Sequence, residues 1–159
     1  MLGTGKVEFP PLLPAGFHEM PLPALRHLCV DGFPLSTVRA GLMGGIEAIC
    51  GSLSTALVPA SVWIDGSFMT QKIDPADVDL AVRLSFAALP SPGPEQQALF
   101  ARIAGKQFAG CDSYIFIEYP EGHPEHAAGD MMRAYWQRQF GFSRGDEFKG
   151  VAVIRTPFA

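Results

Sequence analysis

Residues 63–82 read Trp-Ile-Asp-Gly-Ser-Phe-Met-Thr-Gln-Lys-Ile-Asp-Pro-Ala-Asp-Val-Asp-Leu-Ala-Val, and the rest of the chain can be arranged around them. A short apolar strand, Ser61 to Ile64, leads into a Gly66-Ser67 turn. After a polar loop, residues 77–82 alternate between polar and apolar side chains, which predicts a second strand. Side chains two residues apart on a strand share a face. Asp77 and Asp79 are therefore expected to point the same way, with Cα atoms about 6.6 Å apart.

The two carboxylates predict a metal site. Two like charges this close repel each other unless a cation lies between them. Mg²⁺ prefers oxygen ligands and usually takes one or two carboxylates together with substrate phosphates, so Asp77 and Asp79 are candidate ligands. Gly66 lets the backbone come close to a ligand, and the Ser67 hydroxyl can then hold a phosphate oxygen. Lys72, in the loop, is either a triphosphate-binding cation or a solvated lysine.

A site for two metal ions needs a third acid, and Asp112 is the candidate. This residue stands at the mouth of a predicted strand, Ser113 to Tyr119, directly after a predicted helix. If that strand lies beside the strand of Asp77 and Asp79, all three carboxylates meet at one place.

The remaining patterns predict an α/β domain with a mixed sheet of about four strands flanked by helices. Residues 1–33 form a proline-rich arm on the surface with a short helix over 23–29, and residues 34–159 form the core of one domain. Apolar spacings predict helices over about 38–57, 94–108 and 126–140, and a last strand over about 149–156. Because Gly44 and Gly45 fall inside the first of these helices, it either packs very closely on a neighbour or breaks there.

Composition excludes several classes of protein. The chain has 159 residues, of which 48% are hydrophobic and 18% charged, and its net charge is −4. With no basic surplus, non-specific binding to duplex nucleic acid is not expected. The longest uncharged stretch, Ala48 to Ile64, is too short and too polar to span a membrane, and no signal peptide is expected. Three scattered cysteines predict free thiols in a reducing cytoplasm; they are Cys29, Cys50 and Cys111.

The segment from Ser61 to about Ile117 resembles the nucleotidyltransferase superfamily related to DNA polymerase β. The resemblance rests on Gly66-Ser67, a nine-residue gap and Asp77-Val78-Asp79, followed by Asp112 one strand later. It implies that the Gly-Ser turn binds the phosphates of a nucleoside triphosphate, ATP by default. It also implies that Asp77 and Asp79 bridge two Mg²⁺ ions, and that Asp112 holds the ion on the acceptor side and helps to deprotonate the acceptor. The reaction implied is transfer of a nucleoside monophosphate, AMP by default, to an acceptor hydroxyl, on a protein or another molecule.

Two further stretches resemble small uncharacterised bacterial and phage proteins of this superfamily. They are the Phe-Pro-Pro-Leu-Leu-Pro-Ala-Gly segment at residues 9–16 and the later Tyr-Trp, Phe-Gly and Lys-Gly pairs. Asp65 departs from the superfamily pattern, in which an apolar residue usually precedes the glycine. It is either an additional acid in the site or an outward-facing strand end.

Other interpretations stay open at this stage. The chain is alternatively a catalytically degenerate binding module, an antitoxin-like partner of a toxin, or an unrelated α/β domain with a chance match. His123 and His126 have a spacing that metal ligands use, but a loop leading into a helix is favoured. Arg144 and Lys149 are each either a phosphate-neutralising cation or a surface charge. A final set of side chains either stacks on a base or packs in the core: Tyr135, Trp136, Phe140 and Phe142.

Overall fold

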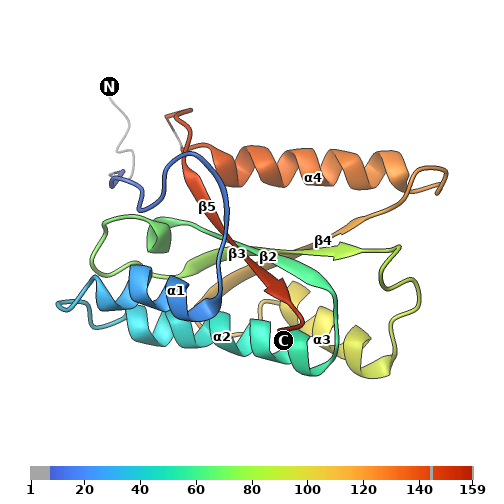
Figure 1. Ribbon diagram of the computed structural model, residues 1–159, viewed down its shortest axis with the longest axis horizontal. Helices are drawn as coiled ribbons and strands as arrows, with labels where there is room; N and C mark the ends of the chain where they lie inside the picture. Colours follow the sequence, from blue (N-terminus) through green and yellow to red (C-terminus); the bar gives the residue numbers. More distant parts are fainter. Residues whose placement is uncertain (1–7, 144, 159) are drawn as a thin grey trace.

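A computed structural model, which describes residues 8–143 and 145–158, has a five-stranded mixed sheet in the order β1-β5-β2-β3-β4 (Figure 1). The strands are β1 (Gly16–Glu19), β2 (Ala60–Asp65), β3 (Val78–Ser85), β4 (Cys111–Glu118) and β5 (Gly150–Thr156). The β1–β5 and β3–β4 pairs are parallel, whereas β5–β2 and β2–β3 are antiparallel. The predicted α/β class with a mixed sheet is confirmed.

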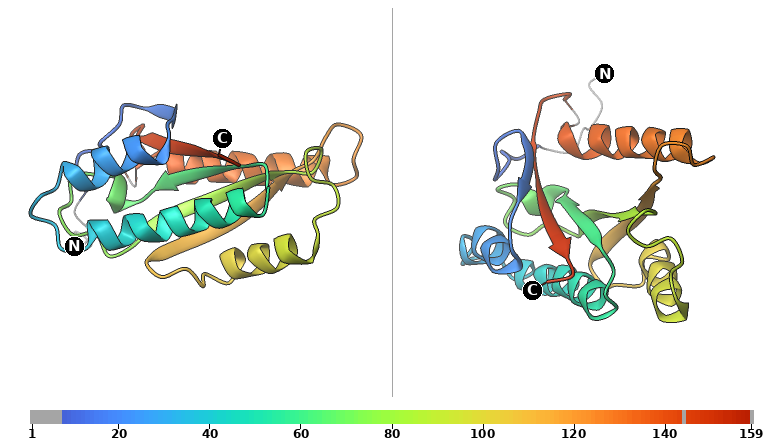
Figure 2. Two further views of the ribbon diagram at one scale, coloured as in Figure 1. Left: turned by 60° about the horizontal axis from the view of Figure 1, so that its bottom comes forward. Right: turned by 45° about the vertical axis from the view of Figure 1, so that its right-hand side comes forward.

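Helices cover both faces of this sheet. On one face lie α1 (Leu22–Arg26), its π-helical continuation η1 (His27–Asp31), α2 (Arg39–Thr55) and α3 (Pro94–Ala104). The other face carries α4 (His126–Gly141) (Figures 1 and 2). A single 3₁₀ turn, η2 (Ser67–Met69), follows β2. Among the described residues, no helix is both long enough and apolar enough to cross a membrane.

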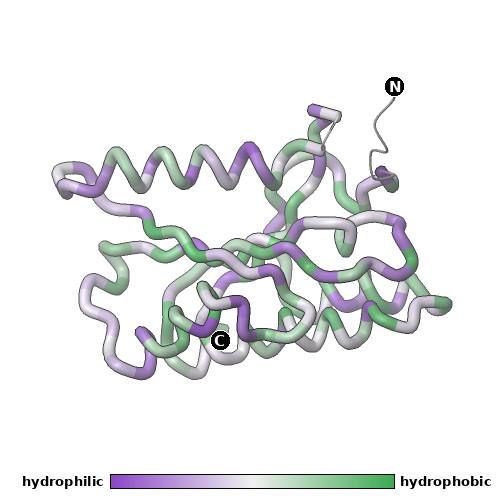
Figure 3. The backbone as a smooth tube through the Cα atoms, turned by 180° about the vertical axis from the view of Figure 1, so that it is seen from behind, coloured by the Kyte–Doolittle hydropathy of each residue, from purple (hydrophilic) through white to green (hydrophobic). Residues whose placement is uncertain are grey.

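The sheet therefore separates two apolar layers. The larger layer packs α1, α2 and α3 against the sheet and includes Ile46, Leu80 and Ile103. The smaller layer lies under α4. It consists of Trp63, Ala81, Phe116, Trp136, Phe140, Val151 and Val153. In Figure 3, α4 alternates between hydrophobic and hydrophilic residues along its length, as a helix with one buried face does.

Strand β1 was not predicted, because the sequence pattern of residues 1–33 indicates a surface arm. The segment pairs in parallel with β5, and Phe17 packs on Trp63 with ring centroids 4.7 Å apart. A four-residue strand has too few residues to show a periodic pattern, and its partner is more than 130 positions away in the register Gly16 to Gly150. The remainder of the arm up to Val7 lies outside the described residues.

Helix α2 runs through its glycines without a break. A Cβ atom built on Gly45 would lie 2.8 Å from the carbonyl oxygen of Ala109 and 2.8 Å from the sulfur of Cys111. The glycine thus allows α2 to pack directly on the beginning of β4, which is the first of the two predicted alternatives. This contact fixes the end of β4 that carries Asp112.

A buried arginine at the start of α2 holds the loop between β2 and β3. Arg39 is fully buried, and its guanidinium lies 3.7 Å from the centroid of the Phe33 ring. It donates hydrogen bonds to backbone carbonyls of the loop and of η1, namely those of Cys29, Phe68, Thr70, Lys72 and Ile73. Burial lowers the pKa of Arg39 from its usual value. The five carbonyls satisfy this guanidinium and so fix the path of the loop.

Candidate active site

Three aspartates from three adjacent strands form a row across the sheet. Asp65 on β2 is paired in register with Asp79 on β3, and Asp79 with Asp112 on β4. Residues paired in this way point to the same face of a sheet. Trp63 and Ala81, two positions away on β2 and β3, pack under α4, so the row lies on the α4 face of the sheet.

Asp77 joins this row from the loop just before β3. One carboxylate oxygen each from Asp77, Asp79 and Asp112 can be chosen so that all three lie within 4.8 Å of one another. Oxygens around one Mg²⁺ ion lie about 3–4 Å apart, so small side-chain rotations would bring all three to a single ion. The structure thus brings the three predicted acids together. Two details differ from the prediction. Asp112 lies within β4 and not just before it, and Asp77 lies just before β3 and not within it.

The electrostatics of the row fit a cation. Burial, and then the negative charges of Asp77, Asp112 and Asp65, raise the pKa of Asp79 to about 6. In addition, Oδ1 of Asp65 is buried without a hydrogen-bond partner among the described residues. Carboxylates crowded in this way are stabilised in their charged form by a bound divalent ion. The donor set is all oxygen, which Mg²⁺ prefers over sulfur and nitrogen.

Gly66 is required at the end of β2 for two reasons. Its φ is +83°, a conformation that residues with side chains rarely adopt, and a Cβ atom there would lie 2.7 Å from Oδ2 of Asp79. The glycine therefore makes room for the Asp79 carboxylate, a reason that the sequence analysis did not anticipate. Ser67 follows it as the first residue of η2 and is partly exposed beside the acids.

Asp112 has two partners that sequence reasoning missed. The ammonium of Lys106 forms an ion pair with Oδ1 of Asp112, and the Tyr114 hydroxyl donates a hydrogen bond to Oδ2 at 3.1 Å. The hydrogen bond from Lys106 holds the pKa of Asp112 below its usual value. Lys106 follows the last turn of α3, and β4 begins five residues later. That position could have indicated its proximity to Asp112.

Lys106 also adopts an unfavourable backbone conformation. Its φ is +55°, in the position after a helix where glycine is preferred. The amide of Lys106 donates to the carbonyl of Ile103 and that of Gln107 to the carbonyl of Arg102, both at 3.0 Å, which are the two hydrogen bonds of a Schellman motif.

At the other end of the row, Asp65 pairs with Lys149. Oδ2 of Asp65 lies 2.8 Å from the Lys149 ammonium, and the two side chains are 5% and 20% exposed. Burial raises the pKa of Asp65 to about 6, although the charge of Lys149 opposes the rise. Of the two alternatives for Asp65, the outward-facing strand end is wrong, because this carboxylate is buried in the row of acids. Arg144 lies outside the described residues.

Lys72 does not contact the acids in the structure. Its carbonyl accepts hydrogen bonds from Arg39, and its ammonium lies 5.9 Å from the centroid of the Phe9 ring. The Arg39 bonds explain its position, since they turn the loop between β2 and β3 toward η1. Its role in binding a triphosphate stays a prediction.

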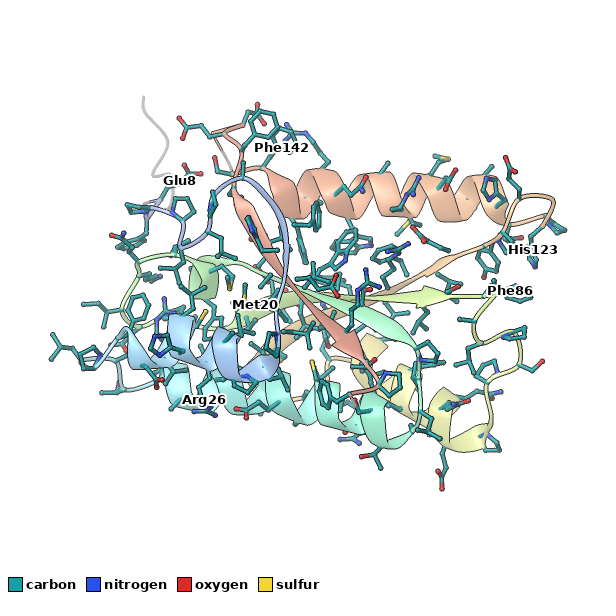
Figure 4. The ribbon with its side chains drawn as sticks, viewed as in Figure 1. Glu8, Met20, Arg26, Phe86, His123 and Phe142 are labelled. Atoms are coloured by element: carbon teal, nitrogen blue, oxygen red, sulfur yellow. The ribbon has the colours of Figure 1, made fainter. Side chains whose placement is uncertain are left out.

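The two histidines lie at the opposite end of the sheet, beyond the ends of β3 and β4. His123 packs against Phe86, beside the end of β3 (Figure 4), with ring centroids 4.5 Å apart. It also stacks on Tyr119, with ring centroids 4.6 Å apart. A ring nitrogen of His126 lies 2.7 Å from the Tyr119 carbonyl. Neither histidine is part of a metal-binding group in the portion of the chain that the structure describes.

The late aromatic residues divide between core and surface. Trp136 and Phe140, on the inner face of α4, are buried against the sheet, as the core alternative predicted, whereas Tyr135 is exposed. Phe142 packs against Phe148 with ring centroids 4.7 Å apart.

Residues 7–155 match a family described as a family of unknown function (DUF6932). No curated protein and no solved structure matches the chain.

Proposed function

The chain belongs to the family of unknown function DUF6932, and from the geometry of the acidic row we propose that it is a Mg²⁺-dependent nucleotidyltransferase. It would move a nucleoside monophosphate, by default AMP from ATP, onto an acceptor hydroxyl. One observation carries the proposal. Asp77, Asp79 and Asp112 bring carboxylate oxygens within 4.8 Å of one another, beside a Gly66-Ser67 turn whose glycine has a positive φ.

Each residue of the site has its own role in the proposed reaction. Asp77, Asp79 and Asp112 would hold Mg²⁺, which neutralises charge on the phosphates and lowers the pKa of an acceptor hydroxyl. Asp112 is the acid at the outer strand of the sheet, and its side chain is 33% exposed. An acceptor hydroxyl can therefore reach it from solvent. Ser67, which directly follows Gly66, would donate its hydroxyl hydrogen to a phosphate oxygen.

The chemistry needs a charged Asp77, so the test removes that charge. The assay is transfer of label from α-³²P-ATP to proteins, RNA or small molecules of a cell extract, compared for the wild type and Asp77→Asn. Transfer is expected to fall by at least about 100-fold in the variant, because a metal ligand has lost its charge. Asp31→Asn is the matched control, since Asp31 is an exposed acid on η1. Equal labelling by the wild type and Asp77→Asn would refute the proposal.

A second candidate is a catalytically degenerate binding module that acts as an antitoxin-like partner of a toxin. It is favoured by three exposed large apolar side chains on α4, namely Met131, Met132 and Tyr135, which a protein partner could cover. Dependence of function on Mg²⁺ separates the two candidates. In either case the proposed compartment is the cytoplasm, because Cys29, Cys50 and Cys111 are buried free thiols.

A further inference from the structure

The ion pair between Asp65 and Lys149 places a cation beside the Gly66-Ser67 turn. Asp65 immediately precedes that turn and is paired in register with Asp79. The Lys149 ammonium, 2.8 Å from Oδ2 of Asp65, therefore lies at the β5 end of the row of acids. We propose that Lys149 binds the phosphates of the nucleotide at this site and that Asp65 is its positioning residue. This inference rests on the proposed nucleotidyl transfer.

The burial of Asp65 and Lys149 indicates that their ion pair does more than stabilise the fold. An apolar residue at position 65 would fit the rest of β2, whose residues from Ser61 to Ile64 are buried. A buried ion pair contributes little net stability compared with apolar residues of similar size, because both charges lose water. The net stability that the Asp65–Lys149 pair contributes is lower still, because Oδ1 of Asp65 has no hydrogen-bond partner among the described residues. A carboxylate that orients the ammonium of Lys149 toward a ligand accounts for this arrangement.

Exposure and the positions of the other lysines support the same assignment. The Lys149 side chain is 20% exposed, so its ammonium is held in place and still accessible to an anion. Lys106 is paired with Asp112 at the opposite end of the row, and its ammonium lies 3.4 Å from the centroid of the Tyr114 ring. Lys72 lies near Phe9. Of these three lysines, Lys149 is the one paired beside the Gly-Ser turn.

The test measures binding rather than transfer. Affinities of the full chain for ATP and for inorganic tripolyphosphate are measured by titration calorimetry with Mg²⁺ present, and its affinity for Mn²⁺ alone is measured by electron paramagnetic resonance. Lys149→Met is expected to weaken ATP and tripolyphosphate binding by about 10- to 100-fold, the effect of losing one charge-assisted hydrogen bond, and to leave Mn²⁺ binding intact. Arg155→Met is the matched control. Arg155 pairs with Glu19 further along β5, and its removal is expected to change neither affinity by more than about twofold.

Two further variants guard against a loss of folding. Lys149→Met leaves Asp65 as an unpaired buried charge, so the double variant with Asp65→Asn removes both charges together. It is expected to fold and to bind tripolyphosphate as weakly as Lys149→Met alone, because Asp65 acts through Lys149. Asp65→Asn alone is expected to weaken binding less, since the ammonium remains but is no longer oriented.

The outcomes separate this inference from the proposed function. A folded double variant that binds ATP and tripolyphosphate as tightly as the wild type overturns the assignment of Lys149 and leaves nucleotidyl transfer standing. A wild type that binds neither Mn²⁺ nor ATP overturns both.

Discussion

Replacing Asp79 by asparagine is expected to stabilise the metal-free protein at neutral pH. The pKa of Asp79 is raised from 3.8 to about 6 by burial and by three neighbouring aspartates. An acid whose pKa is raised on folding binds more protons in the folded state, so stability falls as the pH rises from about 4 to about 6. A pKa raised from 3.8 to about 6 corresponds to about 3 kcal/mol that the folded state loses when Asp79 ionises. Part of that penalty is burial, which an asparagine side chain shares, so a gain of about 1–3 kcal/mol is expected at pH 7.

Thermal unfolding in EDTA between pH 4 and pH 8 measures this gain. For a chain of this size, 1–3 kcal/mol corresponds to a rise in Tm of roughly 2–12 °C at pH 7, and the difference should shrink toward zero at pH 4. Burial raises the pKa of Asp65 to about 6 as well, and its charge acts on Asp79, so the difference between the two proteins measures the loss of the Asp79 charge together with its effect on Asp65. Asp31→Asn, on an exposed acid, controls for the loss of one charge. If Asp79→Asn lowers the Tm at pH 7 in EDTA, the carboxylate is a structural acid and the argument for a metal site at this position fails.

Three other changes test the parts of the site separately. Gly66→Ala places a Cβ atom 2.7 Å from Oδ2 of Asp79 at a φ of +83°, so we expect a loss of about 1–3 kcal/mol in urea unfolding and about tenfold weaker Mn²⁺ binding. Gly51→Ala, in open space on α2, should instead gain up to about 1 kcal/mol; equal behaviour of the two glycine variants would contradict the close approach. Lys106→Gly relieves the φ of +55° and removes an exposed ion pair, so unfolding free energy should change by less than about 1 kcal/mol while Mn²⁺ binds more tightly. Unchanged Mn²⁺ affinity would show that the Lys106 ammonium does not compete for Asp112. Arg39→Met leaves five backbone carbonyls without their donor and should cost about 3–5 kcal/mol in urea unfolding, whereas a cost below about 1 kcal/mol would mean that the loop does not depend on this residue.

The acids were predictable because their signals are local. Asp77 and Asp79 are two residues apart, and the period of a strand predicts that they share a face. Asp77 lies just before β3 in the structure, and its carboxylate still meets that of Asp79. Asp112 follows a predicted helix and directly precedes a predicted strand, and a parallel neighbour across such a crossover is a common arrangement. The structure contains that pair, in the register Asp79 to Asp112.

The sequence left two alternatives for Lys149, because its partner in the site depends on contacts between distant segments. Lys149 reaches Asp65 only because β5 lies next to β2, 84 positions earlier in the chain. No pattern within residues 149–156 carries that information. The burial of Asp65 could not be predicted either, because it depends on the register of β2 with β3. Strand β1 was missed because its four residues pair only with the distant β5. Lys106 was missed for a different reason, since its φ of +55° at the end of a helix is unusual for a lysine.

The position of β5 affects the order in which the fold can be completed during synthesis. β5 is translated after the other four strands, yet it lies between β1 and β2 in the sheet. While the chain is being made, β2, β3 and β4 can pair among themselves, but β1 has no strand to join, and one edge of β2 stays open beside Trp63. An open strand edge invites pairing with other chains, so a chain interrupted before residue 150 should be prone to aggregation. Closure of the sheet and arrival of Lys149 at Asp65 would then be one late event, and only chains that extend through β5 would carry the complete site.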